Sequence, residues 1–442
     1  METLNTCSNT PLLKQTTCAY CGVGCGVDIS LLNNTPTKLE GTREHPANFG
    51  RLCVKGTHLL DTIGTDNRLT SPLIDNEPAS WDTATDYVAN KFNAIIKEHG
   101  PESVAFYVSG QLLTEDYYVA NKLMKGYIGS GNIDTNSRLC MSSAVAGYKR
   151  AFGEDVVPCN YDDLEQTELL ILIGSNAAWT HPVLYQRMER AKKLNPNMKV
   201  VVIDPRKTDT AELADTFLNI KPGSDGALYN GLLNYLSEHN YLDTQFINAH
   251  TNGFETALAE AKKWSVKAVS DFCDIDAQLV SDFYALFAQS PTAISFYSMG
   301  INQSSSGVDK CNAIINAHLA SGKLLKPGCG PFSITGQPNA MGGREVGGLA
   351  NQLAAHLDIE NDAHQQLVQR FWQSPTIAKK AGCNAIDMFD EIAKGKIKAI
   401  WIMATNPMVS LPNNAAIQHA LEQCELVVVS DCIAKSDTLK FA

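Results

Sequence analysis

The stretch Leu169–Asn176, with the sequence LLILIGSN, decides the fold class of this chain. Its apolar run, Leu169–Ile173, contains no polar residue and passes directly into Gly174, Ser175 and Asn176. A strand covered on both faces has an uninterrupted apolar sequence, whereas a strand with one face in water alternates apolar and polar residues. The stretch therefore predicts a strand buried within a parallel sheet and followed by a polar loop.

Further apolar, β-rich runs are separated by amphipathic segments. These runs are Ser103–Val108, Val200–Ile203, Ala293–Tyr297, Ile397–Met403 and Leu426–Val429. Strands that alternate with helices along a chain are typical of α/β folds with parallel sheets. In such sheets, ligands bind outside the carboxyl ends of the strands. We therefore expect the loops that follow these runs to line a binding site.

Three segments between these runs carry helix signals. Thr114 is expected to cap a helix over residues 114–128, because two acidic residues follow it. Pro182 suits the first position of a helix over residues 182–194. A third helix is expected over residues 225–239. These segments complete the alternation of strands and helices.

The composition predicts a soluble, globular protein. The chain has 442 residues, of which 44% are hydrophobic and 19% charged, and a formal net charge of −11. This length predicts about two to four domains, and the acidic balance disfavours binding to the phosphates of a nucleic acid. No apolar run approaches the length of a membrane-spanning helix, and Met1–Gln15 lacks a secretory signal pattern. We therefore expect a cytoplasmic protein with neither nucleic acid nor membrane as a partner.

Four of the thirteen cysteines form the strongest local motif. Cys18, Cys21 and Cys25 are closely spaced, and Cys53 follows after a gap of 27 residues. Four thiolates can hold an iron–sulfur cluster, and the intervening glycines let the backbone wrap closely around it. The alternative is a structural zinc site held by the same four thiols. Ordinary structural or surface roles are expected for Cys7, Cys159, Cys273, Cys311, Cys329, Cys383, Cys424 and Cys432.

This cysteine arrangement, with Lys55 two residues after its last member, resembles the N-terminal domain of the bis-molybdopterin guanine dinucleotide oxidoreductases. The resemblance implies two cofactors: a 4Fe–4S cluster held by the four cysteines, and molybdenum held by two molybdopterin guanine dinucleotides. In this family the equivalent lysine lies between the cluster and one pterin and helps electrons to pass. Without the resemblance, Lys55 would be interpreted as a solvated lysine.

A second block, Asn136–Val145 with the sequence NSRLCMSSAV, resembles the segment that supplies the metal-coordinating cysteine in nitrate reductases of this family. The resemblance implies that Cys140 ligates molybdenum, for which a thiolate is a suitable soft ligand. Formate dehydrogenases of the family typically place a histidine after this ligand, to handle a proton. Met141 has no titratable group and therefore favours nitrate reductase. We expect Cys140 and Met141 to belong to the catalytic site.

Loops after the strands resemble the cofactor-binding segments of the family. A loop that enters a helix offers N–H groups to pyrophosphate or pterin, and Asp204 is suited to accept hydrogen bonds from guanine or ribose. Arg344 is expected to hold nitrate or a pterin phosphate; the alternative is an ion pair with a nearby carboxylate. The expected cofactor-binding residues are Lys55, Gly174, Ser175, Asn176, His181, Asp204, Arg206, Lys221, Gly223, Asp225, Met299, Gly300, Gln303, Gln337, Gly343 and Asn406.

The resemblance covers most of the chain and implies a multidomain α/β fold with Rossmann-like, mostly parallel sheets. Residues 1–62 are expected to form the 4Fe–4S domain. Residues 63–135 plus 333–442 are expected to form a discontinuous α/β domain, and residues 136–332 a dinucleotide-binding-like α/β domain. Family members continue into a C-terminal β-barrel domain. This chain is expected to lack that domain, as a truncated product, a fragment or a split subunit.

The expected activity is the reduction of nitrate to nitrite by oxygen-atom transfer, with electrons delivered through the 4Fe–4S cluster. A cytoplasmic location and a single cluster motif favour nitrate assimilation over respiration. The expected electron donor is ferredoxin, flavodoxin or an NADH-oxidising flavoprotein subunit. Two alternatives stay open: a formate dehydrogenase-type enzyme on the same scaffold, and a non-catalytic iron–sulfur relay or scaffold protein.

Overall fold

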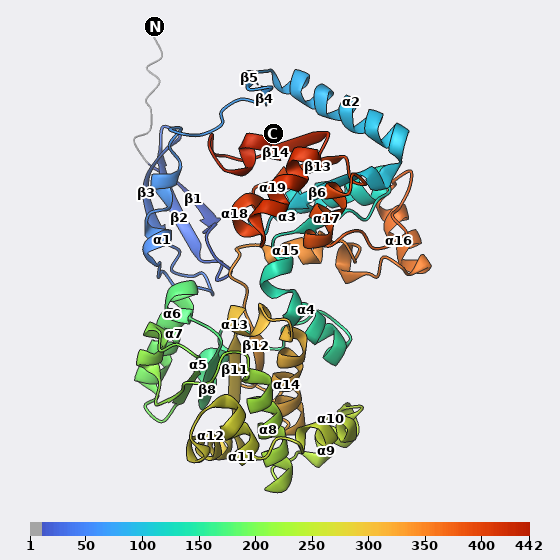
Figure 1. Ribbon diagram of the computed structural model, residues 1–442. Coiled ribbons are helices and arrows are strands. Elements are labelled where there is room, and N and C mark those ends of the chain that lie inside the picture. Colours follow the sequence, from blue (N-terminus) through green and yellow to red (C-terminus); the bar gives the residue numbers. More distant parts are fainter. Residues whose placement is uncertain (1–10) are drawn as a thin grey trace. The chain divides into compact units, whose positions relative to one another are not determined.

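The computed structural model describes residues 11–442. This part of the chain divides into two compact units. Figure 1 colours the chain by sequence position. The first unit contains residues 11–60 and 140–336, and the second contains residues 61–139 and 337–442. Each unit is built around its own parallel sheet. The three-domain division expected from the sequence stays a prediction.

A three-stranded antiparallel sheet opens the first unit and carries the cysteine motif. Its strands are β1 (Leu12–Thr17), β2 (Gly26–Leu32) and β3 (Thr35–Gly41), in that spatial order. Cys18 directly follows β1, and Cys25 directly precedes β2. Because β1 and β2 pair along their whole length, these two cysteines lie at the same end of the hairpin. Helix α1 (Val54–Thr57) begins directly after Cys53.

The parallel sheet of the first unit has the strand order β10-β9-β8-β11-β12. Its strands are β8 (Leu169–Ile173), β9 (Lys199–Ile203), β10 (Thr216–Leu218), β11 (Ala293–Tyr297) and β12 (Gly330–Ser333). Leu169 and Ile171 of the central strand pack in one hydrophobic core with Phe283. Leu170, between them, packs in a second core with Val183. This burial on both faces explains the uninterrupted apolar run.

Helices cover both faces of this sheet, with α6 and α7 on one face and α8, α12 and α14 on the other (Figure 1). The helices with most or all of their residues in the first unit, besides α1, are α4 (Arg138–Phe152), α5 (Asp163–Gln166), α6 (Ala177–Thr180), α7 (Pro182–Leu194), α8 (Asp225–Glu238), α9 (Thr244–His250), α10 (Phe254–Ala261), α11 (Val266–Cys273), α12 (Ala277–Gln289), α13 (Met299–Asn302), α14 (Gly307–Ala320), and the 3-10 helix η4 (Asp209–Leu213). The 3-10 helix η1 (Leu59–Thr62) has two residues in each unit.

The second unit contains a parallel sheet in the order β14-β13-β6-β7 and a small hairpin. Its strands are β4 (Leu73–Ile74), β5 (Glu77–Pro78), β6 (Val104–Val108), β7 (Ile133–Thr135), β13 (Ala399–Met403) and β14 (Leu426–Ser430). Tyr107 of β6 packs in one core with Phe389, and Phe106 packs in another with Phe92. This sheet is therefore also covered on both faces.

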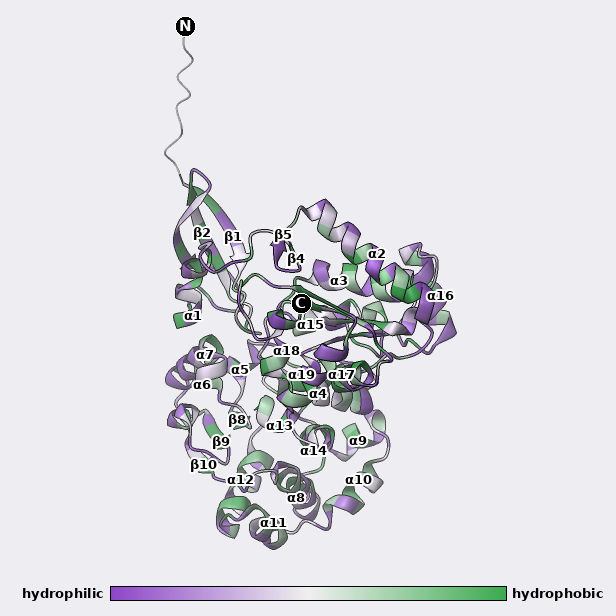
Figure 2. Ribbon diagram, turned by 45° about the horizontal axis from the view of Figure 1, so that its top comes forward, coloured by the Kyte–Doolittle hydropathy of each residue, from purple (hydrophilic) through white to green (hydrophobic). Residues whose placement is uncertain are grey.

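The helices of the second unit include α2 (Trp81–His99), which shows both hydrophobic and hydrophilic residues along its length in Figure 2. Its buried residues, Phe92 and Ile95, face the core. The other helices are η2 (Pro101–Ser103), α3 (Thr114–Lys122), the π-helix η3 (Leu123–Ile128), α15 (Ala340–Glu345), η5 (Ala354–His356), α16 (Asp362–Trp372), α17 (Ala385–Ala393), α18 (Pro407–Ser410), α19 (Asn414–Gln423) and η6 (Thr438–Phe441).

The predicted α/β fold with parallel sheets is confirmed, and each predicted apolar run forms a strand with small shifts at its ends. The cap predicted at Thr114 is wrong. Leu113 occupies the cap position, and its N–H donates to the Asp116 carboxylate at 3.2 Å. Thr114 is already the first helical residue, so its hydroxyl is not at the cap position.

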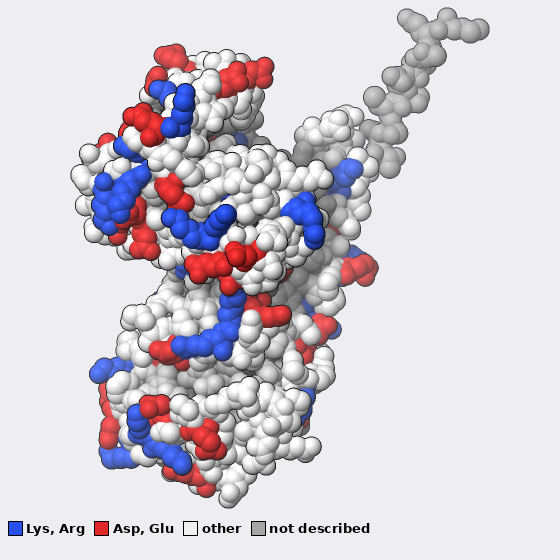
Figure 3. Space-filling model, turned by 90° about the vertical axis from the view of Figure 1, so that its right-hand side faces the viewer, with Lys and Arg blue, Asp and Glu red and all other residues white. Residues whose placement is uncertain are grey.

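The surface and the remaining thiols have ordinary features. Lys and Arg are interspersed with Asp and Glu over the face drawn in Figure 3. Within residues 11–442, no helix is both long and apolar enough to cross a membrane. The cysteines of this part of the chain are all free thiols; Cys7 lies outside the described residues. Cys273, Cys311 and Cys329 are buried, and Cys432 is exposed.

Candidate cluster and metal site

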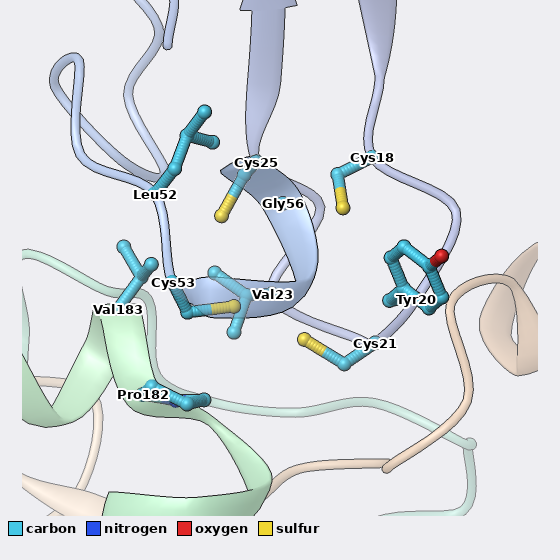
Figure 4. Close-up of a pocket in the computed structure, with 10 residues that line it drawn as sticks. All are labelled: Cys18, Tyr20, Cys21, Val23, Cys25, Leu52, Cys53, Gly56, Pro182 and Val183. Carbon is cyan, nitrogen blue, oxygen red and sulfur yellow. The ribbon is translucent and has the colours of Figure 1, made fainter. Parts of the chain in front are cut away.

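Four thiols converge in the first unit. The side chains of Cys18, Cys21, Cys25 and Cys53 point into one space (Figure 4). These four side chains line one cavity. The other residues that line this cavity are Tyr20, Val23, Leu52, Gly56, Pro182 and Val183. The structure therefore brings together all four cysteines of the sequence motif.

The cavity suits a cluster of several atoms better than a single zinc ion. A zinc ion holds its ligand sulfurs at about 2.3 Å, which draws four thiols together and leaves no cavity between them. Within residues 11–442, no three His, Cys, Asp or Glu side chains are placed to bind one metal ion. Here the four thiols line a cavity instead, and a 4Fe–4S cluster is held by four such thiolates.

Asn48 joins the two segments that carry the cysteines. Its fully buried side chain accepts a hydrogen bond from the Gly26 N–H at 2.9 Å and donates to the Gly26 carbonyl at 3.0 Å. It also donates to the Arg51 carbonyl at 2.9 Å. Gly26 directly follows Cys25, and Arg51 lies two residues before Cys53. Asn48 was not predicted from the sequence, because a single asparagine in a loop forms no recognisable motif.

Burial and mutual proximity make ionisation of these thiols costly unless a cation binds. Burial is the main cause that raises the pKa of Cys18 and Cys21, and it raises that of Cys25 to about 12, with further increases from the neighbouring thiols. Lys55 acts in the opposite direction and lowers the pKa of Cys18 and Cys21. A positively charged iron cluster fits this donor set, because a bound metal deprotonates its thiol ligands.

Two side chains outside the motif fasten the cysteine-bearing segments to the rest of the first unit. The Tyr161 hydroxyl donates to the Gly22 carbonyl at 3.0 Å, within the loop of Cys21 and Cys25. Arg187, fully buried on α7, donates to the Pro46 carbonyl at 2.8 Å. Neither residue was singled out in the sequence, because each acts on a segment more than one hundred positions away.

Cys140 lies in the first turn of α4 and is half-buried. Burial raises the pKa of its thiol, whereas hydrogen bonds from the Gly336 backbone N–H and the Thr335 hydroxyl lower it. Met141, the next residue, is buried and packs in a hydrophobic core with Tyr148. The Cys140 thiol is therefore partly accessible, and its surroundings offset part of the cost of its ionisation.

The partners of Cys140 also contact residues near the cluster cavity. The Gly22 N–H donates to the Gly336 carbonyl at 3.3 Å. His181, the residue before the cavity-lining Pro182, has its Nε2 atom 2.7 Å from the Thr335 carbonyl oxygen. The predicted residues His181 and Cys140 therefore both lie near the short segment that contains Thr335 and Gly336.

The loops after β8 and β11 meet at two glycines. The Gly300 N–H donates to the Gly174 carbonyl at 2.9 Å, and a Cβ atom on Gly300 would lie 2.6 Å from the Gly174 Cα. The buried hydroxyl of Ser175 has no hydrogen-bond partner among residues 11–442, which fits a bound polar group such as a pterin or a phosphate. The Asn176 side chain accepts a hydrogen bond from Thr210 at 2.9 Å.

The other predicted cofactor residues of the first unit fall into two groups. Asp204 accepts a hydrogen bond from the Arg206 N–H at 2.8 Å, and burial raises the pKa of its carboxyl. Asp225 forms a buried ion pair with Lys310 at 2.8 Å, a partner that no sequence motif indicated. The exposed positions are Arg206, Lys221, Gly223, Gly300 and Gln303, and Asp204 and Met299 are partly exposed.

The second unit links Gln337 to residues at the carboxyl ends of its strands. The Gln337 side chain donates to Asn136 at 2.9 Å, and Asn136 donates to the Thr405 hydroxyl at 3.1 Å. The next residue, Asn406, accepts a hydrogen bond from Thr438 at 2.7 Å. Asn136 therefore links the loop that contains Gln337 to the loop that contains Thr405 and Asn406.

Gly343 and Arg344 lie in α15 of the second unit. A Cβ atom on Gly343 would lie 2.5 Å from the Tyr117 ring, so this position requires glycine. Arg344 is half-buried. Because Cys140 belongs to the first unit, the expected cooperation of Arg344 with Cys140 stays a prediction.

Two protein families match this sequence. The family described as Molybdopterin oxidoreductase matches residues 68–442. The family described as Molybdopterin oxidoreductase Fe4S4 domain matches residues 13–64, which include all four cysteines of the cavity. A solved structure, acetylene hydratase from Pelobacter acetylenicus, has the same fold, with a TM-score of 0.77 at 18% identity over 97% of this chain and 62% of that one.

Curated relatives include several proteins named nitrate reductase. One from Klebsiella oxytoca is 55% identical over 97% of this chain and 49% of its own length. One from Shewanella frigidimarina is 51% identical over 97% of this chain and 46% of its own length. A periplasmic nitrate reductase from Desulfovibrio desulfuricans is 36% identical over 96% of this chain and 59% of its own length. The chain therefore spans about half the length of the first two relatives.

Proposed function

Because the chain belongs to the molybdopterin oxidoreductase family, we propose that it is the cluster-binding and metal-ligating part of an enzyme that reduces nitrate to nitrite. Its cofactors are a 4Fe–4S cluster and molybdenum bound to molybdopterin. The observation that carries the proposal is the identity of 55% to a protein named nitrate reductase over 97% of the chain. We further propose two pterin guanine dinucleotides as the molybdenum carriers.

The first unit provides the residues for electron entry and for metal binding. Cys18, Cys21, Cys25 and Cys53 hold the cluster, and Cys140 ligates the molybdenum. The molybdopterin-bound metal supplies the two-electron redox chemistry when it is present. The Gly336 N–H and the Thr335 hydroxyl lower the pKa of the Cys140 thiol, and the positive charge of Lys55 offsets the negative charge of the cluster thiolates.

The remaining predicted residues bind the dinucleotides and the substrate in this proposal. Ser175 offers a buried hydroxyl to a polar group of the cofactor, and the Gly174–Gly300 contact lets two cofactor-binding loops approach closely. Arg344 holds the nitrate anion through its guanidinium group, and Met141 supplies an apolar neighbour that cannot carry a proton.

An assimilatory role in the cytoplasm, with ferredoxin, flavodoxin or an NADH-oxidising flavoprotein as electron donor, is the finer part of the proposal. One relative is named a periplasmic nitrate reductase, so the compartment needs its own test. Cell fractionation followed by detection of the protein separates the two locations. Loss of growth on nitrate as the sole nitrogen source after gene deletion supports assimilation, and unchanged growth contradicts it.

The activity is tested with the full-length protein, purified with its cofactors. A reduced viologen dye serves as electron donor for nitrate, and formate oxidation is measured in parallel. We expect nitrate reduction in the wild type, its loss in Cys140→Ala, and its retention in Cys432→Ala, which removes an exposed thiol. Formate oxidation in place of nitrate reduction would overturn the proposal, as would a protein that holds iron without molybdenum.

A further inference from the structure

A fully buried lysine lies on an irregular helical turn of the second unit. Helix α3 continues directly into the π-helix η3, and Lys125 is the third residue of that turn. Turns of this kind are rare in proteins and frequently occur at functional sites. A buried ammonium group is costly unless its protons are bound, so the partners of Lys125 indicate its role.

The hydrogen-bond partners of Lys125 all belong to one short segment, residues 347–352. The Nζ atom donates to the carbonyls of Gly347 at 2.7 Å, Leu349 at 2.8 Å and Gln352 at 2.5 Å. An ammonium group has three protons, so all of them are used on this segment. The lysine therefore fixes a loop that lies more than two hundred positions away in the sequence.

A buried ion pair holds the same segment. Arg138 donates to both carboxylate oxygens of the fully buried Asp134, at 3.0 and 2.9 Å. The Ala350 N–H donates to this carboxylate at 3.3 Å, and Arg138 also donates to the Asn351 side chain at 3.1 Å. Together with Lys125, three charged side chains thus hold one short loop.

The loop fixes the backbone of Arg344 in α15. The buried side chain of Gln352 donates to the Arg344 carbonyl at 2.8 Å. The Gly347 N–H donates to the same carbonyl at 3.0 Å. Both ends of the segment that Lys125 binds are therefore hydrogen-bonded to the residue whose side chain is expected to bind the anion.

Apolar side chains could hold a loop of this kind without the cost of burying a charge. Hydrogen bonds from a charged group add direction, so they fix one conformation of the loop. We propose that Lys125 is a positioning residue, which fixes the backbone of Arg344 through residues 347–352 and so holds the guanidinium group in place for nitrate. This inference rests on the proposed function, in which Arg344 binds the nitrate anion.

The test removes the ammonium group and keeps the length of the side chain. Lys125→Met is compared with Lys398→Met, which removes a lysine of the same unit that pairs with Glu425 at 2.7 Å. Leu421→Ala is the control for a loss of stability alone, because Leu421 is a buried core residue of α19 in this unit.

A second variant covers the case in which Lys125→Met does not fold. Gln352→Met removes the side-chain bond to the Arg344 carbonyl and keeps the backbone carbonyl that Lys125 binds. Nitrate reduction by the full-length protein with its cofactors is measured with a reduced viologen at pH 6.5, below the lowered pKa of Lys125 of about 7. Hydrogen–deuterium exchange of residues 343–352 is measured by mass spectrometry on the same preparations.

We expect Lys125→Met and Gln352→Met to raise the KM for nitrate about tenfold and to change kcat less, because a misplacement of about 1 Å costs up to about a hundredfold. The amides of residues 343–352 should also exchange faster in both variants. Lys398→Met and Leu421→Ala should keep the wild-type KM and the wild-type exchange in this segment.

An unchanged KM or unchanged exchange in Lys125→Met, or equal changes in Leu421→Ala, would overturn the inference. If Lys125→Met does not fold, the same criteria apply to Gln352→Met. Arg344→Gln separates the two levels of the argument. If this variant keeps the wild-type KM, Arg344 does not bind nitrate and that part of the proposed function fails; if it raises the KM while Lys125→Met does not, only this inference fails.

Discussion

The Tyr161 hydroxyl donates a hydrogen bond to the carbonyl oxygen of Gly22 at 3.0 Å, and this bond joins positions 139 residues apart. Gly22 lies in the loop that presents Cys21 and Cys25 to the cluster cavity. Within the loop, the Gly24 N–H donates to the Cys21 carbonyl at 3.3 Å, and the Gly22 N–H donates to the Gly336 carbonyl at 3.3 Å. The tyrosine therefore supports the cluster site from outside the cysteine motif.

Replacing Tyr161 with phenylalanine should weaken cluster retention while the fold persists. The variant loses the hydroxyl hydrogen that the carbonyls of Gly22, at 3.0 Å, and Val23, at 3.2 Å, share. This loss costs about 0.5–1.5 kcal/mol of the free energy of unfolding. It keeps the stacked contact of its ring with Phe332. The measurement is the rate of iron release to a chelator, which should rise in Tyr161→Phe. An unchanged rate would show that the loop is held without this bond.

Replacing Arg187 with methionine should destabilise the protein more strongly. The guanidinium is fully buried and pairs with Asp162 at 2.7 Å and Glu165 at 2.6 Å, besides its bond to Pro46. We expect a loss of about 3 kcal/mol, at the lower end for a broken buried ion pair, because both carboxylates keep some access to water. Denaturant unfolding measures this loss, and Lys193→Met on the exposed face of α7 is the control. Equal stability of the two variants would contradict this role of Arg187.

Lys125 should make stability depend on pH. Its ammonium group is fully buried and donates to the carbonyls of Gly347, Leu349 and Gln352 at 2.5–2.8 Å. Burial lowers the pKa of Lys125 from 10.5 to about 7. Between these values the folded protein binds fewer protons than the unfolded chain, so the free energy of unfolding should increase with pH, by at most about 1.4 kcal/mol per unit.

The measurement for Lys125 is denaturant unfolding at several values between pH 6.5 and 9, a range chosen around the lowered pKa of about 7. The wild type should gain stability relative to Lys125→Met as the pH rises, because the variant has no proton to lose. A constant difference between the two proteins across this range would show that the lysine does not titrate there.

Adding a methyl group at Gly300 should separate the two loops that meet there. A Cβ atom would lie 2.6 Å from the Gly174 Cα, which is closer than packed atoms approach. Overpacking of this kind costs about 1–3 kcal/mol. The expected result for Gly300→Ala is lower thermal stability and less molybdenum per protein, measured by metal analysis. The control is Gly64→Ala, because a Cβ atom at Gly64 would meet no other atom within 4 Å. Gly223→Ala is unsuitable as a control, because Gly223 has a positive φ. Full metal content in Gly300→Ala would contradict the proposed role of these loops.

The sequence was sufficient to predict those strands and helices that a single local pattern determines. The run Leu169–Ile173 forms β8 with those bounds, because a strand buried on both faces leaves an uninterrupted apolar sequence. Strand β12 was not predicted, because it begins with Gly330 and Pro331 and contains a serine. It forms a strand because it pairs with β11, whose paired residues lie 36 positions earlier in the sequence. A short local sequence pattern does not reveal such pairing.

The same limit applies to the site. The four cluster cysteines were recognised from their spacing, and the structure brings them to one cavity. Asn48, Tyr161 and Arg187 were missed, because each acts through a hydrogen bond to a residue distant in sequence or to a neighbouring loop. Common residue types in loops carry no signal until the fold brings their partners together.

In the proposed function, Cys140 is the protein ligand of the molybdenum centre. Molybdenum K-edge X-ray absorption of the full-length protein, compared with its Cys140→Ala variant, measures this ligation. We predict one sulfur neighbour fewer around molybdenum in the variant, with the iron content unchanged. The same number of sulfur neighbours in both proteins would contradict the claim.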